Sequence, residues 1–412
     1  MTNRTTEVAC LSWGEVCARR LDRHALSAPL QDARPADIVG TICGAHAQVL
    51  SAAELSIGLR LAGITRTDIR EALWTERSLI KTFGPRGTVH LLPTQDLPMW
   101  TGALSAIPPS RNSQAKDVRL TPEQTEQVVE AIAIVLDDAE LTIDELSEAV
   151  IASTGPWAGD LAMLAFGGMW PRWRQALTTA ADRGALCFGP NRGSKVTYIN
   201  PRRWLPGFRP ADGQIALAAI VRRYLHAYGP ANPQQFAQWL GTPRRWAMEL
   251  FDSLSTELQQ DEINGTLAWL ATRDTTVSPM ASHSVRLLPY FDAYTVGCQT
   301  RTDSRWPSRK LPGAAHRRDG CRGLAPAPLW PKTRHHSGAI RQTHRHAAPR
   351  PRRAGGTHRG NPRKPTPVDH RHCDRRRSCI SRVLGQVRSA FERESACCVP
   401  LQISSARECR RS

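Results

Sequence analysis

Two hydrogen-bonding side chains, His46 and Gln48, are two residues apart in a segment that the sequence places between two short helices. In an extended link, residues i and i+2 point to the same side, so this pair would present one polar face. The spacing therefore predicts a paired polar face between two helices. The alternative is that His46 only satisfies backbone groups at a helix junction.

Other catalytic signatures are missing from residues 1–300, which contain no phosphate-binding loop, no GxSxG nucleophile motif and no HExxH zinc motif. The five cysteines of this part are scattered, which favours buried thiols in a reducing cytosol over a disulfide framework. A zinc site at His370, His372, Cys373 and Cys379 would lack a second spaced pair of ligands. The sequence therefore predicts no metal and no cofactor.

Three stretches of the chain repeat one order of elements, in which three helices are followed by a hairpin. This is the order of a winged helix. Capping boxes at Ser12/Glu15, Ser51/Glu54 and Thr142/Glu145 predict helix starts. The turns of the first two hairpins both open with Phe-Gly-Pro, and Asn264-Gly265 is a strong signal for the third hairpin. The predicted copies cover about residues 34–95, 120–200 and 212–272.

We therefore expect a mainly α fold with small β-hairpins (α+β), built from three tandem winged-helix domains and a disordered basic C-terminal tail. Residues 1–119 would hold an N-terminal helix and the first winged helix, and residues 120–205 the second. Residues 206–300 would hold the third, incomplete if its closing strands are lost, and residues 301–412 the tail.

Basic residues recur at equivalent places in these copies. They lie at the first two wing tips and at the starts of two presumed third helices, positions that suit contacts with DNA phosphates. The alternative for each is an ordinary solvated charge. The third wing carries Asp261 and Glu262 and is not expected to touch DNA. The predicted DNA contacts are Arg86, Arg172, Arg174, Arg192, Lys195, Arg244 and Arg245.

The composition changes near residue 300. Residues 301–412 hold 27 Lys and Arg against 7 Asp and Glu, whereas residues 1–300 hold 28 against 30, so the net charge of +18 comes from the tail. A stretch such as 328–377 cannot bury enough apolar surface to offset chain entropy. One interpretation is a basic arm that adds nonspecific DNA affinity. Abundant Arg with only three Lys favours another, a frameshift in a GC-rich gene shortly after Cys298.

Three segments carry a family resemblance: Gly44–Leu61, the block Arg-Gly-Thr-Val-His-Leu-Leu-Pro at 86–93, and Leu-Leu-Pro-Tyr-Phe-Asp-Ala-Tyr at 287–294. They resemble the AlkZ/YcaQ-type winged-helix DNA glycosylases over about residues 12–298. The resemblance implies three tandem winged helices around a DNA-binding concavity, and excision of alkylated or crosslinked purines, often N7 adducts of guanine.

The resemblance also implies a catalytic pair. The family motif Gln-x-Gln, or Gln-x-Asp, matches His46-Ala47-Gln48, so the catalytic role carries over to Gln48, and His46 stands where the family usually has Gln. For His90 we favour a structural role, and for Asp292 a structural and a catalytic role are both open.

The function expected from this resemblance is hydrolysis of the N-glycosidic bond of N7-alkylated purines in double-stranded DNA. The enzyme would be a cytoplasmic, nucleoid-associated monomer, and no apolar run is long enough for a membrane span. The alternatives are a non-catalytic winged-helix regulator and a frameshifted, inactive family member.

Overall fold

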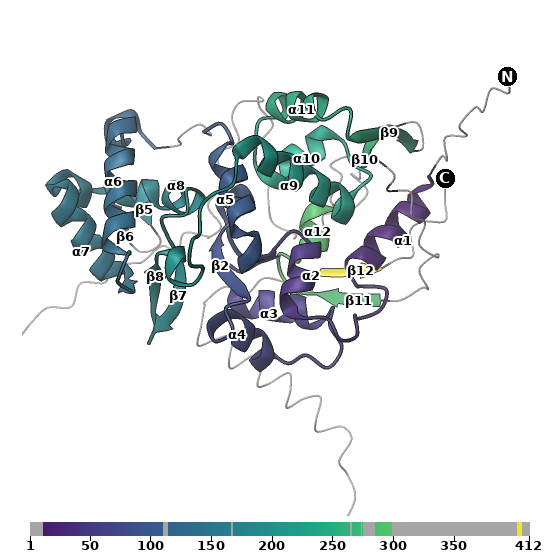
Figure 1. The fold of residues 1–412 in the computed structure, drawn as a ribbon, viewed down its shortest axis with the longest axis horizontal. Coiled ribbons are helices and arrows are strands. Elements are labelled where there is room, and N and C mark those ends of the chain that lie inside the picture. The colour runs from purple at the N-terminus through teal and green to yellow at the C-terminus, as the bar shows by residue number, and fades with distance from the viewer. Residues whose placement is uncertain are drawn as a thin grey trace, which may run out of the picture. The chain divides into compact units, whose positions relative to one another are not determined.

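Three consecutive segments of the chain repeat the order helix, helix, helix, hairpin, and their colours run from purple to green in Figure 1. In the first two segments a short strand follows the first helix. The computed structural model describes residues 11–109, 114–165, 168–263, 266–272, 274, 285–298 and 402–405. All of these residues belong to one compact unit. The observed mixture of helices and small sheets confirms the expected α+β class.

The bounds of the elements follow the predicted order. The first segment consists of α2 (Pro35–Thr41), β1 (Ala45–His46), α3 (Leu50–Gly58), α4 (Arg66–Trp74), β2 (Leu79–Phe83) and β3 (Val89–Pro93). The second consists of α6 (Pro122–Val135), β4 (Leu141–Thr142), α7 (Ile143–Thr154), α8 (Leu177–Asp182), β7 (Cys187–Arg192) and β8 (Lys195–Ile199). The third consists of α9 (Gly213–Tyr228), α10 (Pro233–Leu240), α11 (Arg244–Ser253), β9 (Leu258–Ile263) and β10 (Thr266–Ala271).

Several elements lie outside this repeat. They are α1 (Trp13–Arg23), α5 (Leu97–Ser105), the hairpin of β5 (Leu161–Ala165) and β6 (Gly168–Pro171), β11 (Val285–Leu288), α12 (Ala293–Gly297) and β12 (Gln402–Ser405). Among the helices that the structure describes, none has the length and apolar character needed to cross a bilayer.

One sheet joins the first two segments. Its six antiparallel strands have the order β1-β3-β2-β7-β8-β4, and β2 meets β7 where Lys81 faces Phe188. The Lys81 ammonium group lies 4.9 Å from the centre of the Phe188 ring, a cation–π geometry. The predicted division at residue 119/120 therefore separates two segments that share a sheet.

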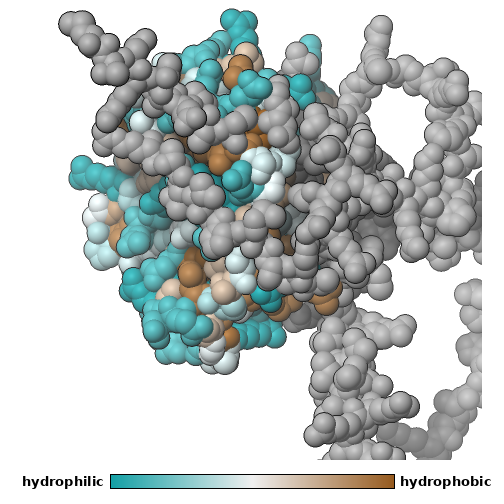
Figure 2. Space-filling view, turned by 90° about the vertical axis from the view of Figure 1, so that its right-hand side faces the viewer, coloured by the Kyte–Doolittle hydropathy of each residue, from teal (hydrophilic) through white to brown (hydrophobic). Residues whose placement is uncertain are grey.

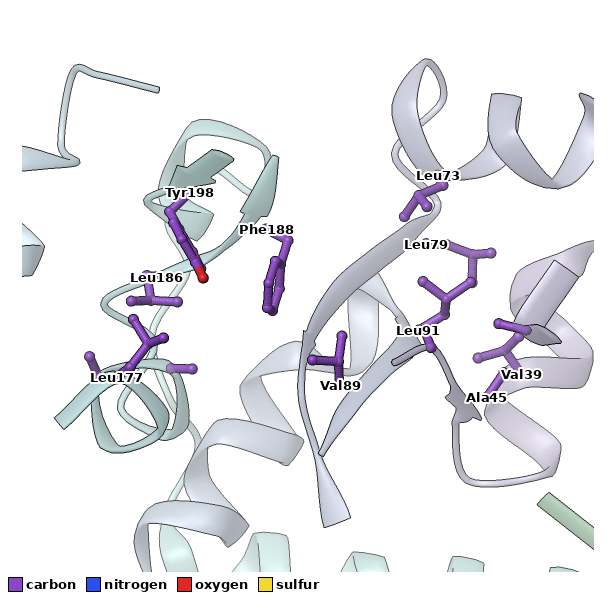
Figure 3. Close-up of a cluster of buried hydrophobic side chains, with 14 of the residues drawn as sticks. Val39, Ala45, Leu73, Leu79, Val89, Leu91, Leu177, Leu186, Phe188 and Tyr198 are labelled. Carbon is purple, nitrogen blue, oxygen red and sulfur yellow. The ribbon is translucent and has the colours of Figure 1, made fainter. Parts of the chain in front are cut away.

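The core follows this sheet across both segments. Figure 3 shows Leu79 and Leu91 on one side of the β2–β3 hairpin, with Phe188 and Tyr198 toward the second segment. The same buried cluster includes Trp173, which is fully buried. Because one cluster serves both segments, a large-to-small change in it would be felt in both.

A second, aromatic core fills the third segment and reaches back to the first. Tyr224 of α9 packs against Phe236 and Trp239 of α10, with ring centres 5.2 and 4.9 Å away. The hydroxyl of Tyr228 donates a 2.7 Å hydrogen bond to the carbonyl oxygen of Ile42, just after α2. The third segment is thereby fixed against the end of the first that leads into β1.

The capping boxes had mixed outcomes. Those at Ser12/Glu15 and Thr142/Glu145 are confirmed, because each side chain bonds the backbone of the other. The box at Ser51/Glu54 is wrong, since the N-cap of α3 is Val49, two residues earlier, and it makes no side-chain cap hydrogen bond. The carboxylate of Glu54 is buried and pairs instead with arginines of α4, including Arg70 at 2.6 Å.

The C-terminal region differs from its expectation in one place. Residues 402–405 form β12, which pairs with β11 in an antiparallel ladder, although no strand was expected after residue 300. The rest of the tail, and residues 264–265 of the third hairpin, lie outside the described residues. The disordered tail and the frameshift therefore stay predictions, whereas the flanking pair Ile263 and Thr266 does close a hairpin.

A buried ion pair ties the segment after β11 to α3. The guanidinium group of Arg60 donates to both carboxylate oxygens of Asp292, at 2.8 and 2.9 Å, and both side chains are excluded from solvent. The hydroxyl of Ser56 donates to the same carboxylate at 2.7 Å, and so does the backbone N–H of Tyr294 at 3.0 Å, which starts α12. Burial alone would raise the pKa of Asp292, but Arg60 and these donors together hold it below its usual value.

Gly44 allows the chain to turn from α2 into β1. Its φ is +100°, and a Cβ there would lie 2.8 Å from the Cδ2 atom of buried Leu92. We expect Gly44→Ala to lower the free energy of unfolding by about 2–4 kcal/mol, from backbone strain plus overpacking. Gly63→Ala is the matched control, since φ there is +73° with open space around it, and it should cost about 1 kcal/mol. Urea denaturation measures both, and equal losses would contradict the predicted clash.

Asp292→Asn would leave the buried charge of Arg60 without its counter-charge. We expect it to lower the free energy of unfolding by about 3–5 kcal/mol. Glu249→Gln, which breaks the exposed Arg245–Glu249 pair, should cost less than about 1 kcal/mol.

The pH dependence provides a second measurement on Asp292. Because its pKa is depressed in the folded state, the stabilisation is complete above the unfolded value of about 3.9 and is lost as the pH falls below it. The difference in unfolding free energy between wild type and Asp292→Asn should therefore shrink in acid. A difference that is constant down to pH 2 would exclude this ion pair as its source.

Candidate active site

The extended link through β1 places His46, and Gln48 just after the strand, on its outward face. Ala45 pairs with Leu91 of β3, and the N–H of Ala47 donates a 2.7 Å hydrogen bond to the carbonyl oxygen of Val89. Ala45 and Ala47 are fully buried, whereas His46 is half-buried and Gln48 is exposed. The link therefore has the period-two alternation expected of an extended chain, and the two polar side chains lie on the same side.

Three rings meet at His46. Its ring lies 5.3 Å from that of His90, its cross-strand partner on β3, and 4.5 Å from that of Phe291, which directly precedes Asp292. Beside them is a cavity of about 10 Å³, which is on the scale of a single water molecule. Its lining is Cys43, Gly44, His46, Arg86, His90, Tyr228, Trp239, Phe291, Ala293 and Val296.

Both histidines are neutral at physiological pH. Burial, followed by the positive charge of Arg86, lowers the pKa of His46 to about 4. Burial also lowers the pKa of His90 to about 3, and His46 and Arg86 act in the same direction, against the hydrogen bond to Thr88. A neutral imidazole keeps a lone pair, so His46 can accept a proton or a hydrogen bond from water.

The tautomer of His90 follows from its backbone contact. Its Nδ1 atom lies 2.8 Å from the carbonyl oxygen of Thr88. A carbonyl can only accept, so Nδ1 carries the proton and Nε2 keeps the lone pair. This backbone partner agrees with the structural role favoured for His90, and its ring also forms part of the cavity wall.

Arg86 belongs to this cavity and not to an exposed wing tip. It is half-buried, it lines the cavity with His46 and His90, and its guanidinium donates to the carbonyl oxygen of Trp239. The sequence suggested a solvent-facing phosphate contact, because nothing local shows that α10 covers this turn. The structure instead places a fixed positive charge next to the two histidines.

The basic residues of the second segment are already engaged. Arg192 pairs with Glu145 at 2.9 Å and Lys195 with Asp144 at 2.7 Å, yet about half of each side chain stays exposed. Arg172 pairs with Asp160 at 3.1 Å.

Two of these residues do not start a helix as expected. Arg172 and Arg174 lie on a 3-10 turn over 172–176, and the helix proper, α8, begins only at Leu177. The guanidinium group of Arg174 lies 4.1 Å from the centre of the ring of Trp170, an exposed tryptophan of β6.

In the third segment the two arginines do stand at a helix start. Arg244 and Arg245 are the first residues of α11, and both are exposed. Arg245 makes an ion pair with Glu249 one turn along the same helix, with 92% of its side chain still exposed. Of the seven predicted basic contacts, Arg86 alone lines the cavity beside His46.

Sequence reasoning missed the aromatic wall of the cavity. Phe291, Tyr228 and Trp239 come from two distant parts of the chain and meet only in the folded protein. The signal that could have found Phe291 is its place in the aromatic-rich segment 287–294.

The arrangement suits hydrolysis without an acidic side chain at the reacting centre. None of the described residues that line the cavity carries a carboxylate. Asp292, the nearby candidate, is held in the buried pair with Arg60, which favours its structural role. Among the described residues no cluster of three potential ligands could hold a metal ion. The lining provides the neutral imidazole of His46 and room for one water, whereas Gln48 is exposed two residues along the chain and does not line the cavity.

Comparisons with known proteins point to DNA glycosylases. The chain is 32% identical over 307 residues to an interstrand DNA cross-link repair glycosylase from Streptomyces sahachiroi, covering 71% of this chain and 79% of that protein. The solved structure of Streptomyces sahachiroi DNA glycosylase AlkZ superposes with a TM-score of 0.61 at 30% identity, again covering 71% of this chain and 79% of the other.

The model of the AlkZ-like DNA glycosylase family matches residues 39–330. This match continues past Cys298, where the sequence suggested that the family-like part ends. It includes β1, the cavity and the segment 287–294. The chain therefore belongs to the AlkZ-like DNA glycosylase family and is a DNA glycosylase, a hydrolase that acts on the N-glycosyl bonds of DNA.

Proposed function

We propose that this enzyme excises N7-alkylated purines, cross-linked ones included, from double-stranded DNA, with Gln48 holding the attacking water and His46 assisting it. The observation that supports the proposal is that His46 and Gln48 lie on the same side of the extended link through β1, and that His46 lines a cavity of one-water size. Gln48 is exposed and is not among the lining residues of that cavity. The relative from Streptomyces sahachiroi, named for interstrand cross-link repair, supports the substrate class.

The chemistry of an N7-alkylated purine explains why so little acid is needed. Alkylation makes the base cationic, so the base leaves without being protonated by the enzyme. The sugar then develops oxocarbenium character, and a water must be held at its anomeric carbon. The glutamine amide can orient this water, and the neutral imidazole of His46 can accept its proton.

DNA binding is the task of the three repeated segments in this proposal. Each forms a winged helix, with the divisions 1–119, 120–205 and 206–300. Arg244 and Arg245, exposed at the start of α11, contact phosphates, and Arg172, Arg174, Arg192 and Lys195 contribute from the second segment. The enzyme acts as a monomer on the nucleoid in the cytoplasm.

Removing either polar side chain should slow the excision step. We expect His46→Ala and Gln48→Ala each to reduce the single-turnover rate on a duplex with one N7-methylguanine by about 10²-fold or more. Gln127→Ala, an exposed glutamine on α6, is the matched control and should leave the rate unchanged. If both active-site variants kept the wild-type rate, the catalytic assignment would be wrong.

The pH profile tests His46 separately. Because the pKa of His46 is about 4 in the folded enzyme, we expect the rate to stay level from neutral pH down to about pH 5 and to fall near pH 4. His46→Gln, which restores the usual family residue, has no titrating group there and should lose this acid limb. A wild-type limb near pH 6.5 would contradict a neutral, half-buried His46. Spontaneous depurination without enzyme is subtracted at each pH.

The salt dependence of binding tests the arginines of α11. Each phosphate contact contributes about one to the slope of log K against log salt concentration. We expect Arg244→Gln combined with Arg245→Gln to reduce that slope by up to about two, measured on an undamaged duplex. Arg183→Gln removes an exposed arginine that pairs with Glu126 and should leave the slope unchanged. If wild type, the Arg244/Arg245 double variant and Arg183→Gln all had the same slope, α11 would not contact DNA phosphates.

A further inference from the structure

Two aromatic rings beside the candidate active site are partly open to solvent. Tyr290 is 46% exposed and Phe291 is 40% exposed, and their ring centres are 3.7 Å apart. Phe291 also contacts His46, with ring centres 4.5 Å apart. Neither ring belongs to a described core cluster, so packing of the protein interior does not account for them.

The backbone under these rings is strained. Tyr290 and Phe291 are the central residues of a turn closed by a 3.2 Å hydrogen bond from the N–H of Asp292 to the carbonyl oxygen of Pro289. Phe291 has a φ of +58°, a left-handed conformation that glycine or asparagine adopts readily and a bulky residue rarely does. Such strain persists only where the surroundings impose it, and it gathers at functional sites.

The surroundings that impose this conformation are the ion pair and the helix start that follow it. Asp292 is fixed on one side by Arg60 and Ser56, and on the other it accepts the first hydrogen bond of α12. The backbone of Phe291, which precedes Asp292, therefore cannot rotate freely. As a result, the exposed ring of Phe291 is held next to His46.

Other large apolar side chains of the described surface are exposed as well, Leu164 and Leu267 among them, but they do not line the cavity beside His46. On the face of the molecule that Figure 2 shows, hydrophilic residues cover most of the described surface, with separate hydrophobic patches between them. The planes of the two rings are tilted by 49° to each other, so each ring offers its own face and the two do not form one flat surface. A fixed, exposed aromatic face suits a flat ligand. Base–aromatic stacking is a usual way of holding a base that has left the duplex stack.

We propose that Tyr290 and Phe291 form a stacking platform for the target purine, which holds the base while His46 and Gln48 face its sugar. This rests on the proposed function, because it assigns the ligand of the same site. The platform supplies sequence-independent affinity for an extruded base, since every purine has a π face. In this proposal the two rings contact the extruded base itself. They do not fill the gap that the base leaves in the duplex.

Phe291→Gly separates a binding role from a structural one. Glycine accepts the positive φ without strain, so the variant should unfold at the wild-type temperature or above while the ring is lost. Phe291→Trp keeps an aromatic face and should keep binding. Leu287→Ala, an exposed apolar residue on β11 just before the turn, is the matched control and should change nothing.

The binding probe is a duplex with a single 2′-fluoro-N7-methylguanosine, whose glycosidic bond resists hydrolysis, compared with a duplex carrying a tetrahydrofuran abasic site. We expect Phe291→Gly to bind the first about tenfold more weakly, the size of one base stack, and to bind the second as wild type does. Both affinities are measured by fluorescence anisotropy.

Each other outcome overturns the platform. A lower unfolding temperature for Phe291→Gly would make the ring a structural element. An equal loss on both duplexes would make it a wedge that fills the duplex gap, and no loss on either would give it no role. A wild-type enzyme that releases no N7-methylguanine from an ordinary duplex would overturn the proposed substrate instead, and that failure is visible without any variant.

Discussion

The buried ion pair between Arg60 and Asp292 is the interaction on which the candidate site depends. Removing two charges from water costs several kcal/mol for each, and this is offset only by good geometry and by donors for the remaining lone pairs. Here both conditions are met, with two guanidinium contacts and further donors from Ser56 and Tyr294. Because a buried charge needs its partner and its hydrogen-bond donors in place, the backbone around Arg60 and Asp292 can adopt few other conformations. The ion pair therefore fixes the turn that holds Phe291 against His46.

The opposite wall of the site is fixed by different means. His46 stands on a strand of two residues, which has little stability of its own. It is held because Ala45 and Ala47 are buried in the core and because β3 supplies the backbone partners. Gly44 lets the chain enter this strand, and the hydroxyl of Tyr228 bonds the backbone just before it. Residues of the first and third segments thus meet at one small cavity.

Local patterns in the sequence predicted the local structure well. Two capping boxes, the three hairpins and the alternation around Ala47 depend on residues close in the chain, and each is present. The failures involve long-range contacts. Glu54 pairs with arginines of α4, and the first two hairpins join one sheet where Lys81 faces Phe188. The carbonyl oxygen of Trp239 accepts a hydrogen bond from Arg86. No spacing rule reveals such contacts, because they depend on how whole segments pack.

Arg86 connects the electrostatics of the site to its chemistry. Burial is the main reason that the pKa of each imidazole is low, and the positive charge of Arg86 acts in the same direction. An active site that had to protonate its leaving base would need an acidic group that is protonated at physiological pH. A base that is already cationic needs only a held water and an acceptor for its proton, the roles proposed for Gln48 and for the neutral imidazole of His46. The neutral state of the imidazoles supports the proposed N7-alkylated purine, whereas the positive charge of Arg86 does not, since it repels a cationic base.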